Sequence, residues 1–99
     1  MKNYQQELDQ WFKEKKWDYW KPHEILARLM EETGEFARLV NHIHGPKKKK
    51  ITESEQDLEE ELGDIIYTLI CYANSNGIDL DNAIKKSFNK VITRDKDRY

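Results

Sequence analysis

Cysteine is nearly absent from this chain of 99 residues, which has one, Cys71, together with two prolines and four glycines. One thiol can form neither an internal disulfide nor, by itself, a thiolate zinc site. Cys71 lies in the apolar run of residues 65–72, where a thiol is expected to behave as a small buried hydrophobe. The sequence therefore gives no support to a disulfide-stapled fold.

The chain also lacks a long apolar segment and an excess of one charge. No stretch approaches the ~20 apolar residues that cross a bilayer, and residues 1–10 do not resemble a signal peptide, so we expect a cytoplasmic protein. The 17 basic and 19 acidic residues give a net charge of -2, which provides no overall field toward nucleic acid or an anionic membrane. Neither nucleic acid nor a membrane is an expected partner.

Charged residues make up 36% of the sequence and hydrophobic residues 37%. A single domain over residues 1–99 must therefore have a thin core, because much of every helix has to face water or another subunit. We therefore expect a homo-oligomer.

Helical periodicity covers most of the chain, and no segment shows the alternation of a β-strand. The predicted fold class is all-α, with four helices completed by oligomerisation. Pro22 suits the first turn of a helix, Gly45-Pro46 and Asn76-Gly77 are stop signals, and Asp79 is a plausible N-cap. The first two predicted helices cover about residues 4–16 and 22–44. The third begins after a cap at Thr52 or Ser54 and ends at about residue 74, and the fourth runs from Asp79 toward residue 99.

Glu32 interrupts the apolar side of the second predicted helix. At about 100° per residue, it falls in the middle of the core-facing stripe. That stripe consists of Ile25, Leu29, Phe36, Val40 and Ile43. Glu35 falls at the edge of the stripe beside Glu32, whereas Glu31 points away from both. Because an unpaired buried carboxylate is costly or becomes neutral, the position of Glu32 demands a compensating partner.

The third predicted helix presents a second carboxylate pair, Glu61 and Asp64, at the same spacing of three. The pair flanks an apolar stripe formed by Leu58, Leu62, Ile65, Leu69 and Tyr72. If the two helices pack antiparallel, the four carboxylates converge. The stripes carry no basic residue except Arg28, which lies at the edge of its stripe. A divalent cation is therefore the better partner, and oxygen ligands favour Mg²⁺, with Mn²⁺ as an alternative. The predicted metal ligands are Glu32, Glu35, Glu61 and Asp64.

Two other interpretations of these acids compete with the magnesium site. They could be ordinary solvated acids on amphipathic helices, although two pairs that flank apolar stripes make this less favoured. They could also belong to a di-iron carboxylate bundle, but such bundles use Glu-x-x-His. Neither Glu32 nor Glu61 has a histidine three residues later, which argues against iron.

A basic ridge, defined as Lys90, Arg94 and Arg98, recurs at intervals of four along the last predicted helix. Fixed cations of this kind complement the anionic oxygens of a polyphosphate. The alternative, equally favoured by these residues alone, is a surface helix with salt bridges to Asp95 and Asp97. The lysine run at residues 47–50 is interpreted as a solvated turn.

Two segments together resemble a known family. Residues 29–36, Leu-Met-Glu-Glu-Thr-Gly-Glu-Phe, and residues 60–64, Glu-Glu-Leu-Gly-Asp, are similar to the EExxE and ExxD motifs of MazG-like nucleoside triphosphate pyrophosphohydrolases. The resemblance extends over roughly residues 17–99. In the C-terminal pattern Lys-x-Asn-x-Arg, Lys90 and Arg94 match, whereas Ile92 stands where the family has asparagine.

The resemblance implies an all-α enzyme that uses Mg²⁺ to hydrolyse a nucleoside triphosphate to the monophosphate and pyrophosphate, with nucleotide-pool house-cleaning as a candidate role. It also implies a dimer or tetramer. Carried over residue by residue, the metal ligands of the family correspond to Glu32, Glu35, Glu61 and Asp64. Glu31 is a candidate for a base or for an outer contact of the metal site.

Trp17 and Trp20 are candidates for stacking on the nucleotide base, with core packing as the alternative for each. Two functions of other classes stay open. One is a non-catalytic helical adaptor or assembly protein that binds a metal without turnover. The other is a nucleic-acid-binding module that uses residues 47–50 with the basic ridge, which the overall charge balance opposes.

Overall fold

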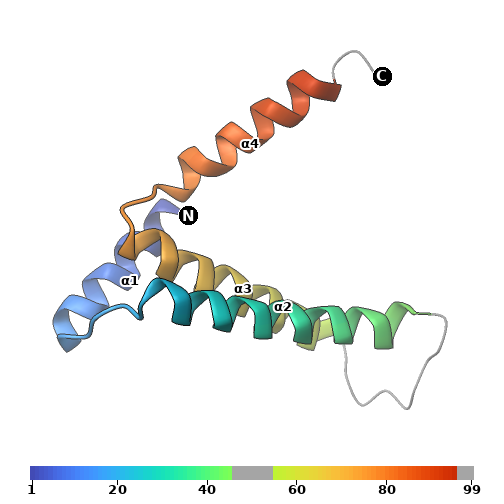
Figure 1. The fold of residues 1–99 in the computed structure, drawn as a ribbon, viewed down its shortest axis with the longest axis horizontal. Coiled ribbons are helices and arrows are strands. Elements are labelled where there is room, and N and C mark those ends of the chain that lie inside the picture. The colour runs from blue at the N-terminus through green and yellow to red at the C-terminus, as the bar shows by residue number, and fades with distance from the viewer. Residues whose placement is uncertain (46–54, 96–99) are drawn as a thin grey trace. The chain divides into compact units, whose positions relative to one another are not determined.

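The computed structural model describes residues 1–45 and 55–95, which are helical and contain no strand. Figure 1 shows the helices, which are α1 (Lys2–Lys15), α2 (Pro22–His44), α3 (Glu55–Ser75) and α4 (Leu80–Asp95). The all-α prediction is confirmed, and the predicted bounds agree to within about two residues wherever both ends are described. The predicted caps at Thr52 or Ser54 and the lysine run lie outside the described residues. None of the described helices is long and apolar enough to cross a membrane.

The helix ends follow the predicted signals. Pro22 begins α2, and the backbone N–H of Lys21 donates to the Glu24 carboxylate at 3.0 Å, which caps the first turn. Gly77 follows α3 with a φ of 67°, a conformation that glycine adopts without strain. The carboxylate of Asp79 accepts from the Asp81 N–H at 2.9 Å, which confirms Asp79 as the N-cap of α4.

The chain forms two compact units. One comprises residues 20–72, which hold α2 and most of α3, and the other comprises residues 1–19 with 73–99, which hold α1 and α4. The single domain predicted over residues 1–99 stays a prediction.

In the unit of residues 20–72, α2 and α3 run antiparallel beside one another (Figure 1). Ile25 and Leu39 of α2 are each 3% exposed, and Thr68 and Ile70 of α3 are also buried. Leu39 was missing from the predicted stripe. Cys71 is partly buried, and burial raises the pKa of its thiol, as expected for a small hydrophobe.

The predicted core stripe of α3 is wrong at three positions. Leu62, Leu69 and Tyr72 are 45%, 41% and 40% exposed. Residues 65–73 carry apolar side chains on several sides of the helix, so periodicity cannot select the buried side there. In this stretch the buried residues are Thr68, Ile70 and Ala73.

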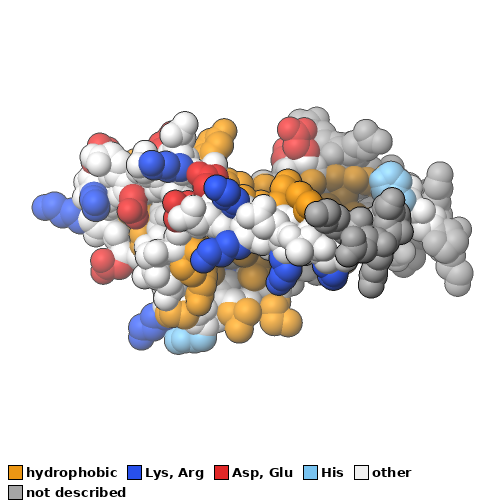
Figure 2. All heavy atoms as spheres, turned by 90° about the horizontal axis from the view of Figure 1, so that it is seen from above, with side chains coloured by type: hydrophobic (Ala, Val, Ile, Leu, Met, Phe, Trp, Pro, Cys, Tyr) orange, Lys and Arg blue, Asp and Glu red, His pale blue; other side chains and the backbone are white. Residues whose placement is uncertain are grey.

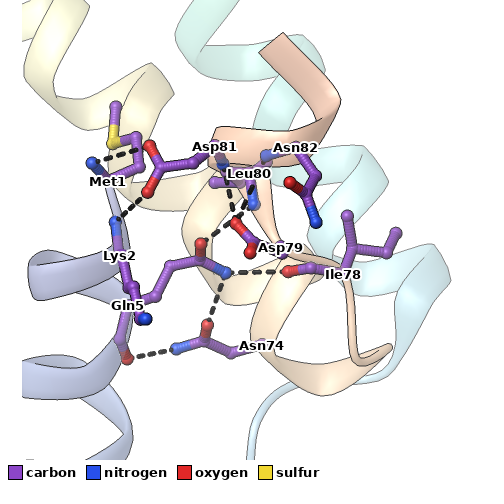
Figure 3. A network of polar contacts seen from close by, with 9 residues as sticks. All are labelled: Met1, Lys2, Gln5, Asn74, Ile78, Asp79, Leu80, Asp81 and Asn82. Carbon is purple, nitrogen blue, oxygen red and sulfur yellow. Dashed lines mark hydrogen bonds and ion pairs between the residues drawn. The ribbon is translucent and has the colours of Figure 1, made fainter. Parts of the chain in front are cut away.

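In the other unit, Gln5 of α1 joins the end of α3 to the start of α4 (Figure 3). Its amide nitrogen donates to the Asn74 side-chain oxygen at 3.0 Å and to the Ile78 carbonyl at 2.8 Å. Its amide oxygen accepts from the Leu80 N–H at 3.0 Å. Asn74 in turn donates to the Gln5 carbonyl at 3.0 Å and to the Tyr19 hydroxyl at 2.9 Å. Polar contacts therefore hold these segments together.

Candidate metal centre

Three of the predicted ligands form an acidic cluster, defined as Glu32 of α2 with Glu61 and Asp64 of α3. One carboxylate oxygen from each lies within 4.8 Å of the others. Glu61 and Asp64 share one side of α3 because they are three residues apart, and the antiparallel packing brings Glu32 opposite them. Glu32 is buried at 7% exposure, Glu61 is half-buried and Asp64 is exposed. The cluster thus extends from the interior of the unit to solvent.

Two oxygens of the cluster are buried and lack a hydrogen-bond partner within the described part of the chain. They are Oε2 of Glu32 and Oε2 of Glu61. Buried acceptors are normally satisfied, because leaving them unpaired costs about 1–3 kcal/mol each and more for charged groups. A hard divalent cation with oxygen ligands would satisfy both at once, so the residues present fit such an ion.

Arg28 provides a partner that the sequence interpretation undervalued. Its Nε donates to Oε1 of Glu32 at 2.9 Å, from four residues earlier on α2. The sequence analysis expected a metal ion, and not Arg28, to compensate Glu32. The structure corrects this expectation for Oε1, which Arg28 compensates, whereas Oε2 has no partner within the described residues. The sequence did carry a signal for this ion pair, because an arginine and a glutamate four residues apart are neighbours on the surface of a helix.

Glu61 titrates far from its ordinary range. Burial, followed by the neighbouring carboxylates of Glu32 and Glu35, raises its pKa from 4.5 to about 7. Burial acts by disfavouring the charged form, and side-chain hydrogen bonds with Glu32 and Glu35, followed by their negative charges, act in the same direction. Glu35 is exposed and outside the group of three, yet it is close enough to act on Glu61. Acids that repel each other in this way are poised to bind a cation.

Thr68 lies beside the cluster and was not predicted as part of it. Its hydroxyl donates to the backbone carbonyl of Asp64 at 2.8 Å, one helical turn earlier. The hydroxyl is thereby satisfied inside the unit, because Thr68 is buried. Sequence alone offered no signal, since threonines commonly bond back to their own helix.

The remaining predicted residues are not members of the acidic cluster. Glu31 is exposed and outside the cluster. Lys90 and Arg94 are exposed on α4, and Arg98 lies outside the described residues. Arg94 pairs with Asp95 at 3.1 Å, so one salt bridge of the alternative interpretation is present.

The two candidate base-stacking residues, Trp17 and Trp20, are both exposed. The Trp17 ring packs edge-on against Trp11 and Phe12, with centroid distances of 5.0 and 5.8 Å. This aromatic contact belongs to the unit that holds α1. Trp17 therefore makes aromatic contacts without being buried in a core, and stacking on a base stays a prediction for both tryptophans.

The fold and the acidic cluster together define an all-α protein with a carboxylate site suited to a divalent cation. Residues 21–99 match the MazG nucleotide pyrophosphohydrolase domain, and the chain belongs to this family. It is thus a hydrolase of the nucleotide pyrophosphohydrolase kind.

Similar proteins come from Bacillus. YpjD of Bacillus subtilis (strain 168) is 46% identical over 99 residues, which cover 100% of this chain and 89% of YpjD. YvdC of the same organism is 30% identical over 98 residues, which cover 89% of this chain and 92% of YvdC. The crystal structure of the Bacillus-conserved MazG protein, a nucleotide pyrophosphohydrolase, superposes with a TM-score of 0.77 and 43% identity over 97% of this chain and 93% of that one. The crystal structure of YPJD from Bacillus subtilis gives a TM-score of 0.79 and 44% identity over 96% and 95%.

Proposed function

We propose that this chain hydrolyses a ribo- or deoxynucleoside triphosphate to the monophosphate and pyrophosphate in a reaction that depends on Mg²⁺. The observation that carries the proposal is the pair of buried oxygens without partners, on Glu32 and Glu61, at the centre of the acidic cluster. Such oxygens need a cation, and a triphosphate is a substrate that arrives with one. Mn²⁺ is the alternative ion, because its ligand preferences are similar.

Glu32, Glu61 and Asp64 would hold the ion, with the nearby carboxylate of Glu35 as the fourth ligand. A divalent ion bound there supplies the positive charge that neutralises and orients a triphosphate. Glu32 is buried and Asp64 is exposed, so the cluster reaches solvent at Asp64. A nucleotide can enter from that side. Glu31 is exposed and outside the cluster, so any role as a base or an outer contact depends on a substrate group that reaches it.

The basic ridge is the proposed source of further phosphate contacts. Lys90 and Arg94 are exposed and accessible to an anion, and Arg98 extends the same spacing. Trp17 and Trp20 expose ring surface on which a base could stack.

We propose that the chain assembles as a homo-oligomer. Ile84, Phe88, Val91 and Ile92 of α4 are all exposed, as are Leu26 and Met30 of α2. Figure 2 shows hydrophobic side chains open at the surface of the face that it views. Large apolar patches on a protein surface are normally covered in an assembly. Sedimentation equilibrium on the purified chain should give a dimer or tetramer mass, and a monomer mass would contradict the proposal.

The decisive experiment incubates the protein with a panel of ribo- and deoxynucleoside triphosphates and Mg²⁺, and measures pyrophosphate and orthophosphate separately. Pyrophosphate release from at least one nucleotide, abolished by EDTA, is expected. Orthophosphate in its place would reject the proposed cleavage position. No product from any nucleotide, together with measurable Mg²⁺ binding, would favour the non-catalytic adaptor. A role in nucleotide-pool house-cleaning predicts that a non-standard triphosphate is among the best substrates.

A further inference from the structure

Arg28 and Glu32 form an ion pair whose two members differ strongly in exposure. The Arg28 side chain is 49% exposed, whereas that of Glu32 is 9% exposed. The pair uses Nε of the arginine and Oε1 of the glutamate, which leaves Oε2 of Glu32 without a partner. One end of the pair is therefore fixed in the interior, and the other is carried on a flexible, partly solvated stem.

The positive charge of Arg28 also acts on a residue of α3. The pKa of Tyr67 on α3 is raised by burial and by its contact with Cys71, while the positive charge of Arg28 lowers it in part. Tyr67 lies three residues after Asp64, on the next turn of α3. The guanidinium therefore lies beside the acidic cluster and competes with any cation that enters it.

A divalent cation on Oε2 of Glu32 would lie close to the guanidinium that holds Oε1 of the same carboxylate. They repel each other at short range, and the ion with two charges attracts a carboxylate more strongly at equal distance. A guanidinium also suits phosphate oxygens, because its planar array of donors matches them in pairs. Arg28 has the reach for such a contact, since its side chain is half-exposed next to the cluster.

We propose that Arg28 is the resident counter-ion of Glu32, which it leaves when a divalent cation is bound and then contacts a phosphate oxygen of the substrate. The exchange explains how Glu32 stays buried in the metal-free protein, because Arg28 compensates one of its oxygens there. It rests on the proposed function for the metal and the triphosphate. The proposal adds Arg28, which is outside the predicted ligand set, as a residue that responds to both the metal and the triphosphate.

The first test follows Arg28 in the unmodified chain by ¹⁵N NMR of arginine Nε–H groups, with Arg28→Lys used to assign the signal. In the metal-free protein the signal is expected to be protected from solvent exchange. Saturating Mg²⁺ should shift it and speed its exchange, and a non-hydrolysable triphosphate should then shift it again and restore protection. A signal unchanged by Mg²⁺ would overturn the exchange, and one unchanged by the triphosphate would overturn the phosphate contact.

The second test measures Mn²⁺ affinity without nucleotide by electron paramagnetic resonance. Arg28→Met should bind Mn²⁺ roughly tenfold more tightly, because the competing charge is gone. Lys21→Met, which removes a positive charge at the exposed start of α2, eleven residues before Glu32, should change the affinity less than twofold. Unchanged or weaker binding in Arg28→Met would overturn the proposal for Arg28 alone. Failure of the unmodified chain to bind Mn²⁺ would instead refute the metal site of the proposed function.

Discussion

Glu31 and Glu32 are neighbours on α2, yet Glu32 is 7% exposed within the acidic cluster and Glu31 is exposed outside it. Successive residues on a helix are about 100° apart, so two identical side chains in sequence meet different surroundings. One carboxylate is surrounded by other acids and by Arg28. The other is solvated.

Substitution of these acids should therefore have unequal effects. Glu32→Gln and Asp64→Asn remove charge from the cluster and should abolish pyrophosphate release. Glu31→Gln is the matched control, with the same chemical change one residue away, and should keep much of the activity. Initial rates at saturating Mg²⁺ and nucleotide provide the measurement. Equal losses in all three variants would show that position on the helix does not separate the glutamates.

The raised pKa of Glu61 predicts a pH dependence of stability in the metal-free protein. Between its ordinary value of 4.5 and about 7, the folded chain keeps a proton that the unfolded chain has lost. The free energy of unfolding should therefore fall as the pH rises through this window and level off above it. Urea unfolding in EDTA from pH 5 to 8 measures the effect. Glu61→Gln, which cannot titrate, should flatten the profile, and an unchanged slope would contradict this origin.

Divalent binding should show the opposite pH dependence. Carboxylate ligands must lose their protons before they bind a metal, so Mn²⁺ affinity should rise with pH up to about 7 as Glu61 ionises. Titration of the nucleotide-free protein at several pH values checks this. An affinity that is constant from pH 5.5 to 7.5 would remove Glu61 from the set of ligands.

Arg94 provides the test of the basic ridge. Its exposed guanidinium pairs with Asp95 at 3.1 Å, an interaction that contributes little to stability at a surface. Arg94→Ala should raise the Michaelis constant for the nucleotide roughly tenfold and leave nucleotide-free Mg²⁺ binding unchanged. Lys13→Ala on α1 removes one exposed positive charge as a control. An unchanged Michaelis constant for Arg94→Ala would reject the phosphate role.

Gly34 lies inside α2 between Glu32 and Glu35, where a helix gains from a side chain. A Cβ built at Gly34 meets nothing within 4 Å. Gly34→Ala should therefore raise the free energy of unfolding by about 0.5–1 kcal/mol. Gly77→Ala, at a φ of +67°, should lower it and serves as the contrasting variant. Destabilisation by Gly34→Ala would indicate that another molecule packs against this position.

Asn74 is the centre of the polar network in the unit that holds α1 and α4. Its side chain donates to the Gln5 carbonyl and the Tyr19 hydroxyl, and it accepts from the Gln5 amide. Asn74→Ala leaves these groups without their partner and should cost about 1–3 kcal/mol of unfolding free energy. Asn3→Ala on exposed α1 surface should have little effect. Equal stability of the two variants would show that water replaces the network.

Local signals predicted the helices because they act over a few residues. Pro22 and Asp79 supply their own capping chemistry, and Glu32 could be placed inward because its neighbours at helical spacing are apolar. The same reasoning failed on α3, where apolar side chains around residues 65–73 leave the buried side to be chosen by packing. It also undervalued Arg28, since a flexible arginine at the edge of a stripe can reach inward or remain in solvent.

The Gln5 network could not be predicted from the sequence. Glutamine and asparagine are usual surface residues, and nothing local marks a pair that is 69 positions apart. For the candidate site, spacing predicted which acids share a side of each helix. Their mutual distances, and the buried oxygens that lack partners, depend on how α2 and α3 pack.

The Gln5 contacts also predict an order for folding. They join residues 69, 73 and 75 positions apart in the chain, whereas residues 20–72 form their unit from a continuous segment. Closing a long loop delays the contacts that depend on it. During synthesis the middle of the chain can therefore pair its two long helices first, while α1, although made earliest, has to wait for the last quarter of the protein to emerge.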